Sequence, residues 1–264
     1  MKTALTIAGS DSSAGAGIQA DLRTFNDHDI YGVCAITAVT CQNTVGVSTI
    51  HQVPADIVAS QIEAVVTDIS VSAVKTGMLT NRSIVEVVAQ QITDLSIPSV
   101  VIDPVVVSSS GQRLLDTEAI VPLKTKLLPK ATCITPNRME AELLSDRPVK
   151  SLSDARDAAR SIVDLGAGAV VITGGHFHSE NAIDIFFDGH DVIELVRPRL
   201  AQAIAHGTGC IFSAAITAAL AQGQSLPDAV GMAKSYVFEI MQRGIKLGAG
   251  EKILTKRHKA KETR

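Results

Sequence analysis

Short apolar runs rich in β-branched residues alternate along the chain with longer segments whose apolar positions recur at helical spacing. Strands are predicted over 4–10, 32–42, 72–77, 99–104, 132–136, 169–175, 182–187 and 191–196. Helices are predicted over 16–29, 54–68, 80–94, 117–127, 137–145, 153–165, 208–222 and 226–243. This alternation is typical of an α/β fold, in which βαβ units build a mostly parallel sheet with helices on both faces.

No low-complexity linker or charge block divides the chain, so we expect one domain over residues 1–250. Residues 43–52 follow the second predicted strand and are expected to form an extended flap. The last segment, 251–264, contains six lysines and arginines, and we expect it to be a frayed, solvated tail.

Composition excludes several classes of partner. A net charge of −3 gives no reason to expect binding to nucleic acid or to an anionic membrane, and the 3% aromatic content offers few stacking platforms. No apolar run approaches the length needed to span a membrane. The four cysteines show no CxxC spacing, which indicates free thiols in a reducing cytoplasm.

The segment "HGTGC" (206–210) precedes a helical run and is the first candidate site. Backbone amides of a glycine-rich turn at a helix N-terminus attract anions. The residues concerned are Gly207, Thr208, Gly209 and Cys210. The turn predicts either a binding site for a transferred phosphoryl group or a simple connection between two elements.

A second glycine-rich segment, "GAGIQA" (15–20), matches the dinucleotide-binding pattern GxGxxA. Its context disagrees, because "SDSSA" separates the first glycine from the strand and no acidic residue ends the second predicted strand. We interpret it as a loop that brings backbone close to a ligand.

Candidate metal ligands occur in two further segments. In "TPNRMEAE", Asn137 and Glu140 have the spacing of a helix-capping box, and equally could hold a hydrated Mg²⁺. Asp103, in "VIDPV", follows a strand at the edge of the sheet where ligands of open α/β sheets bind. It could belong to the same metal site or merely cap the next loop.

Six motifs in this order identify a family: "IAGSDSSAGAGIQAD", "TAVTCQNTVGV", "KTGML", "DPVVVSSSG", "TPNRMEAE" and "HGTGC". With them, residues 3–243 resemble hydroxymethylpyrimidine/phosphomethylpyrimidine kinase of thiamine biosynthesis. The resemblance implies a ribokinase-like three-layer sandwich. It also implies two successive phosphoryl transfers from ATP, with Mg²⁺, to 4-amino-5-hydroxymethyl-2-methylpyrimidine.

The resemblance implies a pyrimidine pocket on one side of the site. Gln42 would recognise the ring, since a primary amide offers a donor beside an acceptor and the aminopyrimidine presents the complementary pair. The other residues implied around the pyrimidine are Gly9, Ala16, Asp21, Met78 and Val105.

The nucleotide side is implied in the same way. Asn137 and Glu140 would act on Mg²⁺ and phosphates, Lys234 would contact phosphates, and the "GTG" of 207–209 would form the anion hole. This side departs from the family, because Thr173 stands where the family usually has lysine and Ile211 where it usually has threonine.

Cys210 occupies the position at which many ribokinase relatives carry an aspartate base. A thiol at a helix N-terminus has a lowered pKa, so we expect a partial thiolate that accepts the hydroxymethyl proton. A phosphomonoester is already anionic at neutral pH. The hypothesis is therefore that Cys210 matters mainly for the first transfer.

Two other functions remain open. A pyridoxal kinase of the same cysteine-bearing branch would act on a similar ring, although the segment after "DPV" lacks the second cysteine that would favour it. A non-catalytic pyrimidine sensor would explain the departures on the nucleotide side.

Because the 43–52 flap is exposed and β-prone, a homodimer is also expected.

Overall fold

The computed structural model describes residues 1–108, 111–175, 180–200 and 205–256. The strands of the main sheet are β1 (Thr3–Asp11), β2 (Tyr31–Gln42), β3 (Val47–Gln52), β4 (Ala73–Thr76), β5 (Val100–Ile102), β6 (Cys133–Ile134), β7 (Val170–Ile172), β8 (Asn181–Phe187) and β9 (Val192–Pro198). Within the described residues their order is β3-β2-β1-β4-β5-β6-β7-β8-β9. The strands from β2 to β7 pair in parallel, whereas β3, β8 and β9 pair antiparallel at the two edges.

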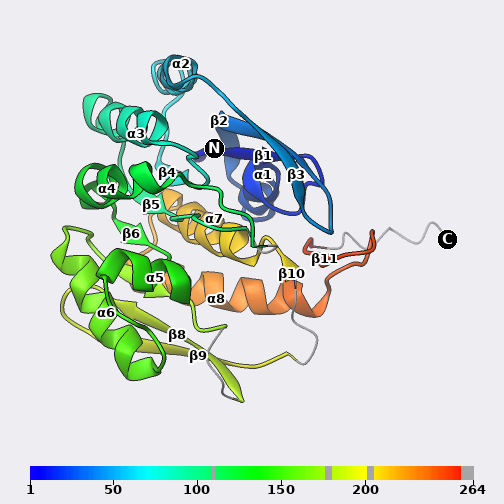
Figure 1. Cartoon of the computed structure of the whole chain (residues 1–264), viewed down its shortest axis with the longest axis vertical. Helices are drawn as coiled ribbons and strands as arrows, with labels where there is room; N and C mark the ends of the chain where they lie inside the picture. The colour runs from blue at the N-terminus through cyan, green and yellow to red at the C-terminus, as the bar shows by residue number, and fades with distance from the viewer. Residues whose placement is uncertain (109–110, 176–179, 201–204, 257–264) are drawn as a thin grey trace.

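Helices cover both faces of this sheet, as the sequence predicted. They are α1 (Gly17–Asp27), α2 (Ala55–Val66), α3 (Arg82–Asp94), α4 (Ile120–Pro122), α5 (Arg138–Ser145), α6 (Leu152–Asp164), α7 (Thr208–Ala221) and α8 (Leu226–Gln242). Helices α2 to α6 lie on one face, and α1, α7 and α8 on the other (Figure 1). The result is the expected three-layer α/β sandwich.

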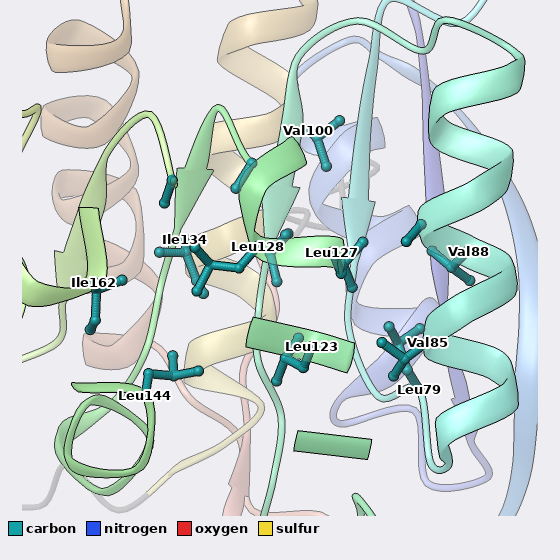
Figure 2. Close-up of a cluster of buried hydrophobic side chains, with 14 of the residues drawn as sticks. Leu79, Val85, Val88, Val100, Leu123, Leu127, Leu128, Ile134, Leu144 and Ile162 are labelled. Atoms are coloured by element: carbon teal, nitrogen blue, oxygen red, sulfur yellow. The ribbon is translucent and has the colours of Figure 1, made fainter. Parts of the chain in front are cut away.

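The central strands are apolar on both faces because each face packs against helices. In β1, Leu5 and Ile7 join the core on the α2–α6 side, whereas Ala4 packs with α1 and α7. Figure 2 shows the first of these cores, where Leu127 and Leu123 lie near Val85 and Val88 of α3. Burying each such side chain contributes roughly 1.5–3 kcal/mol.

The prediction of a regular helix over 117–127 is wrong. The segment consists of a 3₁₀ turn (Thr117–Ala119), the single turn α4, a π turn (Leu123–Leu127) and a 3₁₀ turn (Leu128–Lys130). Pro122 and Pro129 each lack the N–H that a continuous α-helix requires. The apolar residues Leu123, Leu127 and Leu128 of this irregular segment are nevertheless buried.

The start of the expected tail is also corrected. Strand β11 (Lys252–Ile253) pairs in parallel with β10 (Ala205–His206), and Leu254 is buried. The Glu251 amide donates to the Thr44 carbonyl at 3.0 Å, which ties this segment to the flap. Residues 257–264 of the predicted tail lie outside the described residues. No helix in the described part of the chain is long and apolar enough to cross a membrane.

Candidate active site

Several residues singled out in the sequence lie where parallel strands end. Gln42 ends β2, and Met78 and Asp103 closely follow β4 and β5; Asp11 ends β1 at the same edge. The N-terminus of α7 faces this same edge of the sheet through contacts with β1, β4 and β5. Carboxyl ends of strands in open α/β sheets are where ligands bind, so this edge is the candidate site.

The first loop is organised around Asp11, which the sequence analysis did not single out. Its carboxylate accepts hydrogen bonds from the amides of Ser13, Gly15 and Ala16 at 2.8–3.0 Å and from the Ser13 hydroxyl. Burial raises the pKa of Asp11, but hydrogen bonds from His206, Ser13 and Ala16 outweigh it, so the net pKa is lowered. The ionised Asp11 carboxylate therefore fixes the conformation of the loop that contains Ala16, by accepting hydrogen bonds from its backbone amides.

Apolar cover for a ring comes from the end of β4. A Cβ placed on Gly9 would lie 3.1 Å from the Met78 sulfur, so the two predicted residues are neighbours. The Thr37 hydroxyl donates to the Met78 carbonyl at 2.6 Å and fixes the strand end. Val105, also predicted, is half-buried beside Asp103, to which its amide is bonded at 2.9 Å.

The "GTG" turn packs directly onto the first loop. Gly207 has φ +82°, and a Cβ there would lie 2.0 Å from the Gly15 carbonyl oxygen. Only glycine combines this conformation with this approach. Gly209, in contrast, has no atom within 4 Å of a hypothetical Cβ, so space lies open above it.

Beneath this turn lies a buried charge cluster that the sequence analysis missed in part. Lys75 of β4 is fully buried and donates to Asp21 at 2.9 Å, and it lies 3.8 Å from Asp103. Burial opposes its charge, but Asp21, Cys210 and Asp103 together raise the pKa of Lys75. Lys75 begins the motif "KTGML", but the sequence analysis assigned it no role.

The placement of Asp21 near a pyrimidine is corrected by this cluster. Asp21 lies in α1 rather than in the first loop, is fully buried, and accepts from Thr6 at 2.6 Å as well as from Lys75. Its side chain faces Lys75 and β1, so its role is to hold Lys75.

The expectation of a lowered thiol pKa is wrong. Burial raises the pKa of Cys210 to about 12; the Lys75 charge lowers it, but Asp103 and Asp21 raise it further. The Asp103 carboxylate lies close enough to the thiol for the two groups to influence each other's pKa, and it accepts a hydrogen bond from Ser213 at 3.1 Å. Cys210 is therefore protonated at neutral pH, because desolvation outweighs the helix N-terminus.

Asn137 and Glu140 form the capping box that the spacing suggested. The Asn137 side chain accepts from the Glu140 amide at 3.0 Å, and Glu140 accepts from the amides of Asn137 and Val106. Burial, with the nearby Asp103 charge, raises the pKa of Glu140 to about 8. The described residues contain no group of three or more acidic, histidine or cysteine side chains that could hold a metal by themselves.

Lys234 and Thr173, both predicted on the nucleotide side, have partners within the fold. Lys234 of α8 forms an ion pair with Asp184 of β8 at 2.8 Å, and Asp184 accepts from the Gly174 amide. The Thr173 amide donates to the Pro136 carbonyl at 3.0 Å. Lys234 is thus occupied by a partner within the fold, and the structure explains it without a phosphate.

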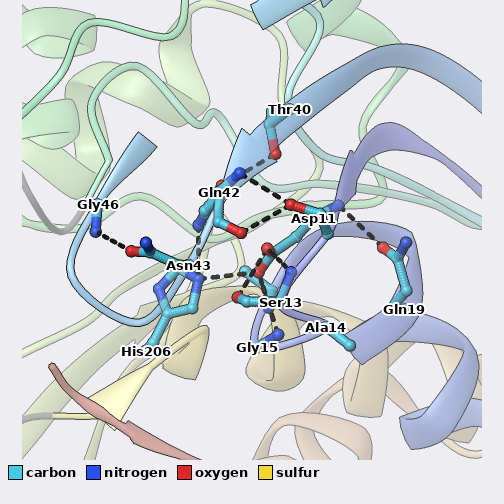
Figure 3. Close-up of polar contacts among 12 residues, drawn as sticks. Asp11, Ser13, Ala14, Gly15, Gln19, Thr40, Gln42, Asn43, Gly46 and His206 are labelled. Carbon is cyan, nitrogen blue, oxygen red and sulfur yellow. Dashed lines mark hydrogen bonds and ion pairs between the residues drawn. The ribbon is translucent and has the colours of Figure 1, made fainter. Parts of the chain in front are cut away.

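Gln42 has a partner that the sequence analysis did not anticipate. Its side-chain nitrogen lies 2.7 Å from Nε2 of His206, and the same Nε2 lies 3.0 Å from Oδ2 of Asp11 (Figure 3). The His206 side chain is nearly buried. The "H" of "HGTGC" was the available signal, but its partners are 195 and 164 residues away in sequence.

Comparison with known proteins decides the family. A family model described as phosphomethylpyrimidine kinase matches residues 11–255. This chain belongs to the phosphomethylpyrimidine kinase family. It is 44% identical over 248 residues to the hydroxymethylpyrimidine/phosphomethylpyrimidine kinase of Bacillus subtilis, covering 94% of this chain and 92% of that one.

Solved structures agree with the family and the ribokinase-like fold. An ADP complex of Bacillus subtilis pyridoxal kinase superposes with a TM-score of 0.91 at 38% identity, covering 97% of both chains. Phosphomethylpyrimidine kinase from Clostridium difficile gives a TM-score of 0.81 at 38% identity, covering 90% of this chain and 99% of that one. This member of the family is therefore a phosphotransferase with a ribokinase-like fold.

Proposed function

We propose that this phosphomethylpyrimidine kinase family member transfers phosphoryl groups from ATP to 4-amino-5-hydroxymethyl-2-methylpyrimidine and then to its monophosphate, in thiamine biosynthesis. The observation that carries this proposal is the packing of the "GTG" turn against the Asp11 loop. It brings Gly207 against Gly15 and Ala16, and it brings His206, directly before the turn, against Gln42. A pyrimidine held by the loop would place its hydroxymethyl group beside Cys210 and the helix N-terminus.

The raised pKa of Cys210 determines how the first proton is moved. We assign the acceptor to the neighbouring side chains of Cys210 and Asp103, which interact in the folded protein. The substrate O–H breaks as an S–H bond forms at Sγ, and the thiol's own proton passes to the Asp103 carboxylate. Burial raises the pKa of Asp103, which makes it a better base, while Lys75 and Ser213 keep it in position.

The backbone of the turn would stabilise the transferred group. The first amides of a helix have no acceptor within the helix, so those that begin α7 would stabilise charge spread over the phosphoryl oxygens. The second transfer needs no proton acceptor, because a phosphomonoester has a second pKa of about 6. Cys210 is therefore proposed to act mainly in the first transfer.

Magnesium is proposed to bind beside Glu140. Glu140 is a buried carboxylate close to Asp103, and both effects raise its pKa to about 8, so a bound cation would stabilise its ionised form. Oε1 of Glu140 accepts a hydrogen bond from the Val106 amide and Oε2 accepts one from the Asn137 amide. The second lone pair of each oxygen would be available to Mg²⁺ or its waters. When bound with ATP, the ion would neutralise charge on the phosphates. Asp103 has Lys75 as its counter-ion, so we place Glu140, with Asn137, nearest the metal.

The similarity to pyridoxal kinases favours pyridoxal as a second candidate substrate. Purified protein is therefore to be incubated with Mg·ATP and either hydroxymethylpyrimidine or pyridoxal, and the products resolved by mass. Mono- and diphosphates of the pyrimidine are expected. Pyrimidine binding without any product would support a sensor, and turnover of pyridoxal alone would refute the pyrimidine assignment.

We also propose a homodimer located in the cytoplasm. β3 is an edge strand, and Val45 in the adjoining turn is 66% exposed, so the flap offers an edge to a second copy. Size-exclusion chromatography with light scattering tests this, and a monomeric mass would contradict it. The four cysteines are free, as in proteins of a reducing compartment.

A further inference from the structure

His206 links the two halves of the candidate site. It belongs to β10, directly before the "GTG" turn, and its ring lies against the Asp11 loop. A Cβ on Gly15 would lie 2.4 Å from Cδ2 of this ring, so the loop has room for the imidazole only because position 15 is glycine. Nε2 of His206 lies between Asp11 and Gln42, at 3.0 and 2.7 Å.

One ring nitrogen cannot serve both neighbours as they are oriented. Nε2 carries either a hydrogen or a lone pair, whereas the Asp11 carboxylate only accepts and an amide NH₂ only donates. The carboxylate of Asp11 accepts from three backbone amides and a hydroxyl, an arrangement that suits the ionised form. A lone pair facing this anion would be repelled, so the hydrogen belongs on Nε2 of His206.

The Gln42 amide must then turn its oxygen toward His206. A half-turn of the amide exchanges oxygen and nitrogen with little change in shape. Thr40 accommodates the exchange, because its hydroxyl lies 3.0 Å from the Ser10 carbonyl and 3.1 Å from the outer end of the amide. With its hydrogen given to Ser10, the Thr40 oxygen accepts from the amide NH₂. The Nε2 hydrogen is shared between Asp11 and the amide oxygen, so no two donors and no two acceptors face each other among these groups.

We propose that His206 is a specificity-determining positioning residue, which fixes the Gln42 amide with its oxygen toward the imidazole and its NH₂ toward Thr40. The remaining lone pair then accepts from an exocyclic amine, and the remaining N–H donates to the adjacent ring nitrogen. A ring with the opposite pattern, a carbonyl beside a ring N–H, meets like groups at both positions. This inference rests on the proposed function and adds the origin of amine selectivity.

The test compares two substrates: 4-amino-5-hydroxymethyl-2-methylpyrimidine and its 4-oxo analogue. The ratio of their kcat/KM values cancels any general loss of activity. In His206→Ala the ratio is expected to fall about ten-fold, the effect of one hydrogen bond that orients the amide. His206→Gln places an N–H close to the Nε2 position and is expected to keep the ratio within about three-fold of wild type.

The coupling to Gln42 supplies the control. In Gln42→Ala the preference for the amino substrate, measured by the ratio of the two kcat/KM values, should already be lost. Adding His206→Ala to Gln42→Ala should then change this ratio no further. If His206→Ala lowers kcat/KM equally for both substrates, or if the two substitutions act additively on the ratio, the residue supports the fold only and the proposal is overturned.

A spectrum of the substrate-free protein tests the arrangement without turnover. Long-range ¹H–¹⁵N NMR should show the Nε2–H tautomer of His206, and an Nδ1–H tautomer would overturn the proposal even if His206→Ala fails to fold. A wild-type protein that phosphorylates neither pyrimidine refutes the proposed function and the substrate preference with it. In that case the tautomer still decides whether His206 orients Gln42.

Discussion

The buried lysine beneath the active-site turn gives the sharpest test of the structure. Lys75 and Asp21 both have fully buried side chains, 2.9 Å apart, and Asp103 is 3.8 Å from the same ammonium. Replacing Lys75 by Met keeps most of the volume but leaves two buried carboxylates without a cation. Breaking a buried pair in this way costs about 3–5 kcal/mol of the free energy of unfolding.

The matched control is Lys124→Met. Lys124 also pairs with a carboxylate, at 2.6 Å, but that carboxylate, on Asp146, is 80% exposed. Exposed pairs contribute less than about 1 kcal/mol, so the control should unfold almost as the wild type does. Urea unfolding followed by circular dichroism at pH 8 measures both variants.

The pH dependence gives a second criterion. Without Lys75, the folded-state pKa values of Asp21 and Asp103 rise further above their unfolded values. The folded variant then binds extra protons, so its deficit relative to wild type grows as the pH rises from about 5 to 8. Adding Asp21→Asn should recover part of the loss. A Lys75→Met protein within about 1 kcal/mol of the Lys124→Met control at pH 8 would refute the buried cluster.

Three further predictions concern the turn, the thiol and the capping carboxylate. Gly207→Ala should reduce kcat at least 100-fold, because the new Cβ would clash with the Gly15 carbonyl. The control is Gly231→Ala in α8, where a Cβ has open space; it should stabilise the protein by about 0.5–1 kcal/mol in thermal unfolding. Equal kcat values for the two variants would contradict the packing of Gly207. Cys210→Ala should slow the first phosphorylation about 10²–10⁴-fold and the second less than ten-fold in single-turnover assays, and equal slowing would exclude the proton-transfer role. Burial raises the pKa of Glu140 to about 8, so the folded state favours its protonated form. Without Mg²⁺, the difference in free energy of unfolding between wild type and Glu140→Ala should therefore shrink as the pH rises from about 5 to 8. A difference that does not change with pH would argue against a buried Glu140.

Much of the architecture followed from periodicity. Each predicted strand of the main sheet is present. The central strands are covered on both faces and so are apolar along their whole length, a pattern that is visible without coordinates. The motif order likewise indicated which loops meet at the strand ends, as Gly9 and Met78 illustrate. The regular helix predicted over 117–127 was wrong, because the prolines in this segment change its hydrogen bonding.

The chemistry of the site depended on contacts that no local pattern contains. A lysine in "SAVKTG" and a cysteine after "GTG" have ordinary pKa values in an extended chain. Their shifts arise from desolvation and from Asp21 and Asp103, which lie on other elements. His206 likewise gains its role from Asp11 and Gln42 across the fold. Sequence determines which groups are present and which strand faces are buried. Charge states and hydrogen-bond partners are decided only by the tertiary structure, because they depend on distance and on the exclusion of water.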